Sequence, residues 1–168
     1  MADKALVENL IKVMQYEYKA YSAVLEIGIK KTDCLVSNDV EGISDITEEE
    51  KKVAEKTSQL SKAREEIVRQ ICNELGEDYK TFTMSKLEEK VDEPYKTQLK
   101  DVGKKLSEVV KKLSDRNDIN RKLIENALKY IDFNIQLLSS PQPEATTYGK
   151  TGDEVSSKMK RSMIDFKY

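Results

Sequence analysis

Histidine and tryptophan are both absent from this 168-residue chain, and glycine and proline are scarce at six and three residues. Without histidine the chain cannot form a Ser–His–Asp or Cys–His catalytic pair, and it has no imidazole metal ligand. Two cysteines, Cys34 and Cys72, are too few for a four-cysteine zinc site and offer no disulfide framework, which fits a reducing compartment. These absences favour a protein that binds a partner over one that catalyses, and we expect no cofactor and no metal.

The chain also has no large excess of either charge, since it contains 29 Lys and Arg and 31 Asp and Glu. A near-neutral balance argues against a strong electrostatic hold on nucleic acid. No run approaches the roughly 20 apolar residues of a membrane span, and the N-terminus lacks the pattern of a signal peptide. We therefore expect a cytoplasmic protein with no nucleic-acid partner and no membrane insertion.

Apolar residues recur at steps of three and four in the first half of the chain, which indicates long amphipathic helices. The first helix is predicted over residues 3–36 and should end near Asn38. A second helix should begin with Asp39 as its N-cap and continue to Leu75, where Gly76 suits a left-handed C-terminal position.

The start of this second helix allows two interpretations. Thr47 and Glu50 could form a capping box and restart the helix at Thr47 after a short first segment. We favour one continuous helix that can bend at Gly42.

Residues 77–93 are predicted to be an irregular connection with a short helix, capped by Thr83 and buried through Leu87 and Val91. The third long helix follows over about 94–138. A helix of about 45 residues is roughly 67 Å long, which is too long for a compact globule of this size. The predicted fold is all-α: an elongated, coiled-coil-like antiparallel bundle of three long helices with one short helix.

The composition changes at Ser139, where two prolines and a run of Ser, Thr and Gly begin. We therefore expect a bundle domain at 1–138 and a flexible C-terminal tail at 139–168 without a core of its own. The tail still carries an amphipathic stripe at steps of four, four and three. The stripe consists of Val155, Met159, Met163 and Phe166.

Two asparagines, Asn117 and Asn120, interrupt the apolar stripe of the third helix. A buried asparagine fixes register or oligomeric state in coiled coils at some cost in stability, so both are candidates to specify the seam. A polar notch that recognises another chain is the alternative.

These residues resemble the FlgN-type flagellar export chaperones. The run NDINRKLIENALKYIDFNIQLL looks like the family's Asn-x-x-Asn-x-x-Leu-Ile block, and Tyr148, Gly149 and Gly152 match a Tyr-Gly-x-x-Gly tail. In the first two helices the match includes Glu17–Tyr18 and Arg64. The resemblance covers nearly the whole chain in the same order.

The resemblance implies a non-enzymatic helical protein that holds hook–filament junction proteins in the cytoplasm, prevents their premature assembly and delivers them to the export gate. Tyr148, Gly149 and Gly152 become candidate contacts to the cytoplasmic domain of that gate. The tail stripe becomes a candidate client contact. A second set in the late third helix either shares in client binding or belongs to the core: Leu123, Ile124, Tyr130 and Ile131.

Two rival functions remain at this point. One is a structural coiled-coil protein that acts by self-association, whereas the chaperone is expected to be a monomer or a weak homo-oligomer. The other is a helical enzyme that uses carboxylates, but the chain has no histidine and no closely spaced acid–base pattern. Glu48, Glu49 and Glu50 suggest a carboxylate metal cluster, but adjacent helical residues point in different directions and no histidine completes a di-metal pattern.

Overall fold

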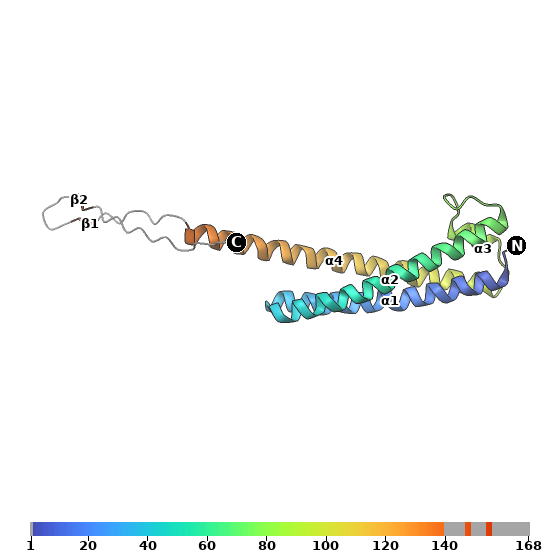
Figure 1. The fold of residues 1–168 in the computed structure, drawn as a ribbon, viewed down its shortest axis with the longest axis horizontal. Coiled ribbons are helices and arrows are strands. Elements are labelled where there is room, and N and C mark those ends of the chain that lie inside the picture. Colours follow the sequence, from blue (N-terminus) through green and yellow to red (C-terminus); the bar gives the residue numbers. More distant parts are fainter. Residues whose placement is uncertain (1, 140–146, 149–153, 156–168) are drawn as a thin grey trace. The chain divides into compact units, whose positions relative to one another are not determined.

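The computed structural model describes residues 2–139, 147–148 and 154–155, and it is dominated by four helices (Figure 1). Along the chain these are α1 (Lys4–Ser37), α2 (Val40–Leu75), the short α3 (Met84–Glu89) and α4 (Tyr95–Ser139). The three long helices pack against one another, so the predicted all-α class is confirmed. The chain divides into two compact units, Met1–Ile124 and Glu125–Tyr168.

The helix ends follow the capping residues that the sequence supplies. The Asp39 side chain accepts a hydrogen bond from the Gly42 amide, and Thr83 caps α3 in the same way. Asn38 ends α1 and Gly76 ends α2, both in the left-handed conformation with φ of 56° and 67°. The alternative restart at Thr47 is wrong, because α2 is continuous and the Thr47 hydroxyl donates to the Ile43 carbonyl inside it.

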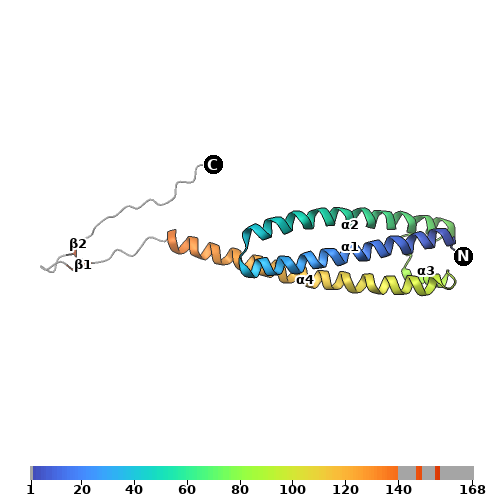
Figure 2. The ribbon, with the colours of Figure 1, turned by 90° about the horizontal axis from the view of Figure 1, so that it is seen from below.

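The core of the first unit lies between α1, α2 and the first part of α4, and α3 closes one end of it. Figure 2 shows α1 beside both α2 and α4. Leu10, Ile71 and Leu99 come from these three helices and are fully buried, while Leu87 of α3 is 2% exposed. The expected burial of Leu87 and Val91 is confirmed.

The chain directions follow from two contacts between α1 and α4. A Cβ on Gly28 would lie 3.2 Å from the Arg116 Cγ, and Thr32 bonds Asn120, 88 residues further along the chain. Both contacts have the same offset, so α1 and α4 run parallel, and the offset brings the last turn of α1 level with Ile124. Gly28 lets Arg116 approach this closely because it has no side chain.

One charge is buried between α1 and α2. Glu17 is 0% exposed, its Oε2 lies 2.8 Å from Arg64 Nε, and its Oε1 accepts a hydrogen bond from Ser61 at 3.0 Å. The Glu17–Arg64 contact is an ion pair rather than an aligned hydrogen bond. It fixes the α1–α2 register, because a slip of either helix would leave the carboxylate buried without its counter-charge.

The second unit contains the end of α4 and two short strands. Thr147–Tyr148 (β1) and Glu154–Val155 (β2) pair antiparallel, with Thr147 opposite Val155 and Tyr148 opposite Glu154. The expected domain boundary at 138/139 stays a prediction, because most of the tail lies outside the described residues.

Candidate functional site

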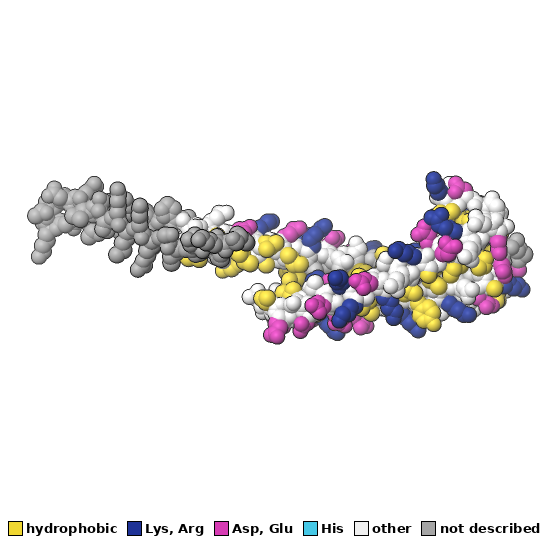
Figure 3. Space-filling view, viewed as in Figure 1, with side chains coloured by type: hydrophobic (Ala, Val, Ile, Leu, Met, Phe, Trp, Pro, Cys, Tyr) yellow, Lys and Arg dark blue, Asp and Glu magenta, His cyan; other side chains and the backbone are white. Residues whose placement is uncertain are grey.

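Exposed apolar side chains are concentrated on the last part of α4, from Glu125 to Ser139, which we name the terminal segment. Figure 3 shows apolar side chains gathered along this end of the helix. Leu138 is 82% exposed, Tyr130 68% and Leu137 63%. In the first part of the same helix, Leu99 and Val102 are buried.

The terminal segment carries three rows of side chains at helical spacing. One row continues the side of α4 that faces the bundle at Asn120, and we name it the seam face: Leu128, Ile131, Ile135 and Leu138. A second row, the outer face, consists of Tyr130, Phe133 and Leu137. Glu125, Lys129, Asp132 and Gln136 form the polar row that separates the two faces on one side. Within each row the steps are three or four residues, so its members share one side of the helix.

A helix with apolar residues on two of its faces, and Asn126 and Asn134 as its polar residues outside the polar row, is close to the pattern of a buried helix. All seven side chains of the two faces are nevertheless more than half exposed. Monomeric soluble proteins rarely expose a contiguous apolar patch above a few hundred Å², and larger ones mark binding sites. The terminal segment therefore has the chemistry of a binding surface.

The late third helix was predicted to be either a client contact or core, and burial separates these possibilities. Ile124 is 37% exposed, Tyr130 68% and Ile131 51%, while Leu123 is half-buried. The core interpretation is therefore wrong for Tyr130 and Ile131.

Five further residues of the two faces were not predicted as site residues: Leu128, Phe133, Ile135, Leu137 and Leu138. The available signal was the pair of interleaved rows at spacings of three and four, which a search for a single stripe overlooks.

The two asparagines of α4 lie in different environments. Asn120 is 4% exposed, donates from Nδ2 to the Gly28 carbonyl at 2.8 Å, and accepts from the Thr32 hydroxyl at 2.6 Å. Asn117 is exposed, so its expected place in the seam is wrong, and Arg116 occupies that place with its donor bond to Thr32. The seam therefore has one buried asparagine, and it joins α1 to α4.

The tail residues are only partly within the described structure. Tyr148 lies in β1 and Val155 in β2, and the roles expected of them stay predictions. The remaining tail candidates lie outside the described residues: Gly149, Gly152, Met159, Met163 and Phe166.

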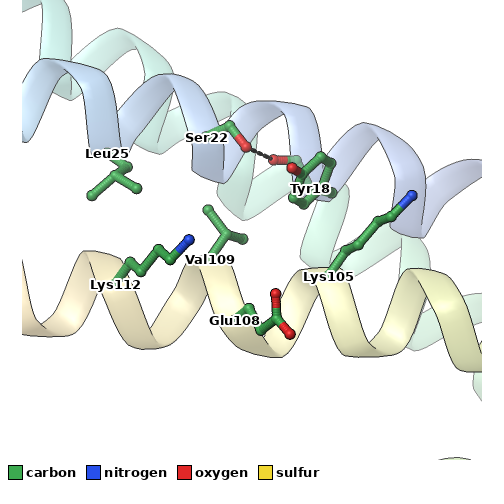
Figure 4. A pocket seen from close by; sticks show the side chains of 7 residues that line it. All are labelled: Tyr18, Ser22, Leu25, Lys105, Glu108, Val109 and Lys112. Atoms are coloured by element: carbon green, nitrogen blue, oxygen red, sulfur yellow. Dashed lines mark hydrogen bonds between the residues drawn. The ribbon is translucent and has the colours of Figure 1, made fainter.

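A small cavity of about 140 Å³ lies between α1 and α4 (Figure 4). Its lining is Tyr18, Ser22, Leu25, Lys105, Glu108, Val109 and Lys112. The Ser22 hydroxyl donates to the Tyr18 carbonyl inside α1, so that hydroxyl is already engaged. Sites for small ligands usually span about 300–1,000 Å³, so this cavity is too small for one.

Reactive chemistry is sparse in the part of the chain that the structure describes. No cluster of three or more Cys, Asp or Glu residues there is placed to hold a metal ion. Cys72 is buried, and desolvation together with the negative charges of Glu77 and Asp78 raises the pKa of its thiol, which lowers the thiolate fraction. None of the described helices is both long and apolar enough to cross a membrane.

The fold and the exposed terminal segment define a class: an all-α protein of long packed helices with an open apolar segment at the end of one of them. The sequence pattern of the FlgN protein family matches residues 1–156. The chain belongs to the FlgN family of flagellar export chaperones. No curated protein matches the sequence, and no solved structure matches it.

Proposed function

We propose that this chain binds hook–filament junction proteins in the cytoplasm through the terminal segment of α4, prevents their premature assembly and delivers them to the export gate. The family membership supports the flagellar export role. The observation that carries the site is the exposure of seven large apolar side chains on two faces of one helix. The client contributes an amphipathic segment that covers these side chains, and no covalent chemistry is involved.

Burial of the two faces provides enough free energy for reversible binding. Completing the burial of a half-exposed aliphatic or aromatic side chain contributes on the order of 1 kcal/mol. The apolar face of the client contributes a comparable amount on its own side, and only the surplus over the cost of association and side-chain ordering appears as affinity. An affinity of this kind protects a client and still allows its release at the gate.

The tail supplies two further proposed contacts. Tyr148, Gly149 and Gly152 are proposed to contact the cytoplasmic domain of the gate, on the resemblance of this motif to the family's tail. Val155, Met159, Met163 and Phe166 are proposed to add a second client contact once a client is present. Separate contacts would let one chaperone hold a client and dock at the same time.

The client site is tested by titrating a purified junction protein into the full chain and measuring the heat of binding. Ile131→Asp combined with Phe133→Asp introduces a charge on each face and should weaken binding at least roughly tenfold, because both charges must be desolvated. The matched control is Val36→Asp with Val40→Asp at the α1–α2 turn, where the side chains are 71% and 72% exposed. Equal losses in both double variants would contradict the assignment of the site.

The gate contact needs its own experiment. Tyr148→Ala should weaken binding to the isolated cytoplasmic gate domain and leave the client affinity unchanged. A matched loss of both affinities would argue against separate roles for the tail motif and the terminal segment.

A structural protein that acts by self-association remains the second candidate, because the two apolar faces could pair with those of another copy. Light scattering of the chaperone alone and with the junction protein separates the two functions. The chaperone requires a heterocomplex of defined mass, whereas the structural protein requires stable homo-oligomers that a client does not dissociate.

A further inference from the structure

The seam face of the terminal segment is exposed along its whole length, although it continues the side of α4 that is buried against the bundle. Leu128, Ile131 and Ile135 are 56%, 51% and 58% exposed. A face of this kind needs an occupant when no client is present, because open apolar surface favours aggregation.

We propose that residues 156–168 of the same chain cover the seam face in the client-free protein, as an antiparallel amphipathic segment that a client displaces. Met159, Met163 and Phe166 are spaced by four and three residues, and they would pack against Leu128, Ile131 and Ile135. This proposal rests on the proposed function in one respect: the face that the segment covers is the face that binds the client.

Chain direction is the first argument for this occupant. β1 and β2 pair antiparallel, with Thr147 opposite Val155, so the chain reverses its direction between them. This pairing sets Val155 beside Thr147, the residue of β1 nearer to α4 along the chain, so a segment that begins at residue 156 has the end of α4 within reach. Only residues 140–146 separate Ser139 from β1, which limits the distance between them to roughly 29 Å.

Length is the second argument. As a helix, residues 156–168 would be about 20 Å long. The seam face from Leu128 to Leu138 extends about 15 Å along α4, so the segment can cover it completely. Because both belong to one chain, the short connection gives the segment a high effective concentration at this face.

Charge is the third argument. The terminal segment has Glu125 and Asp132 against one Lys129, and Asp132 lies one turn from both Leu128 and Ile135 on the seam face. Residues 156–168 contain four basic side chains and one acidic one, and Lys158 and Lys160 flank Met159. A basic segment fits this acidic border, whereas a second copy of α4 would bring two acidic borders together.

Hydrogen exchange measured by mass spectrometry on the client-free full chain tests the proposal. Met163→Asp with Phe166→Asp should accelerate amide exchange at residues 128–138 roughly tenfold, because the cover is lost. Exchange in the core of α1 should stay unchanged. Unchanged exchange at 128–138 would overturn the proposal.

A charge reversal sharpens the test without removing any apolar side chain. Asp132→Lys should accelerate exchange at the seam face, and adding Lys158→Glu with Lys160→Glu should restore the protection. Asp101→Lys, an exposed reversal in the first part of α4, is the matched control and should have no effect. Failure of the rescue would overturn the charge pairing on which the proposed docking depends.

Repeating the exchange measurement at several protein concentrations shows which chain protects the amides of the seam face. Protection from the same chain is independent of protein concentration, whereas protection that grows with concentration would assign the cover to a second copy and overturn the proposal. These measurements contain no client, so they do not test the proposed function. If the seam face shows no protection from exchange and the client still binds, the proposed function is upheld and the internal cover is refuted.

Discussion

Helix α4 is used in two different ways along its length. In its first part Leu99 is fully buried and Val109 is 6% exposed, because the three long helices pack against one another there. In the terminal segment Ile131 and Ile135 are 51% and 58% exposed, although their spacing and chemistry are the same. The difference lies in the neighbouring elements rather than in α4, and it separates apolar residues that stabilise the fold from apolar residues that bind.

The largest expected effect is on stability, and it compares an apolar residue of the core with an apolar residue of the terminal segment. Leu10→Ala should lower the free energy of unfolding by about 2–5 kcal/mol, because it leaves a cavity beside Leu99 and Ile71. Leu137→Ala on the outer face should change it by less than about 0.5 kcal/mol and should weaken client binding instead. Urea unfolding and client titration of both variants check this, and a large loss of stability in Leu137→Ala would remove the distinction.

The next effect compares a buried ion pair with an exposed one. Arg64→Met should lower the free energy of unfolding by about 3 kcal/mol, because it leaves the carboxylate of Glu17 buried without a counter-charge. Arg69→Met removes an exposed pair with Glu65 and should have no measurable effect on stability. Thermal unfolding of the two variants provides the comparison, and similar melting temperatures would show that Glu17 is not held in the core as described.

A smaller effect concerns the buried polar contact that Asn120 makes between α1 and α4. Asn120→Ala should cost about 1 kcal/mol, because its hydrogen bonds to Gly28 and Thr32 are lost in a buried site. Asn117→Ala should be neutral, since Asn117 is exposed. Equal effects in chemical denaturation would mean that Asn120 does not act as the seam-specifying residue.

The smallest expected effect is the response of the first unit to acid. Lys90 Nζ lies 2.8 Å from Glu77, and this hydrogen bond, with the charge of Lys90, lowers the pKa of Glu77 below its usual value of 4.5. A lowered pKa means that the contact stabilises the α2–α3 connection fully above about pH 4.5 and is lost as the pH falls through the lowered value. In an NMR titration, Lys90→Met should return the Glu77 pKa toward its usual value, and an unchanged pKa would show that the contact is not formed.

The fold was predictable to the extent that local signals determine it. The spacing of apolar residues and the caps Asp39, Thr83 and Gly76 placed the helix ends within a residue or two, since these residues act on their own backbone. No comparable local signal indicates the burial of Glu17, which depends on Ser61 and Arg64, about 45 residues away. The predicted place of Asn117 in the seam was wrong for a related reason. The side of α4 that faces α1 carries Arg116 and Asn120, and Asn117 does not lie on it.

By itself the sequence determined that the chain is helical, that it lacks the histidine chemistry of many enzymes, and that it carries the FlgN pattern over residues 1–156. The tertiary structure alone decided which apolar residues are core and which are open. Apolar spacing is the same in both parts of α4, but only the first part packs against the other long helices. The physical reason is that burial depends on which other elements pack against a residue. Sequence periodicity shows only which residues share one side of a helix.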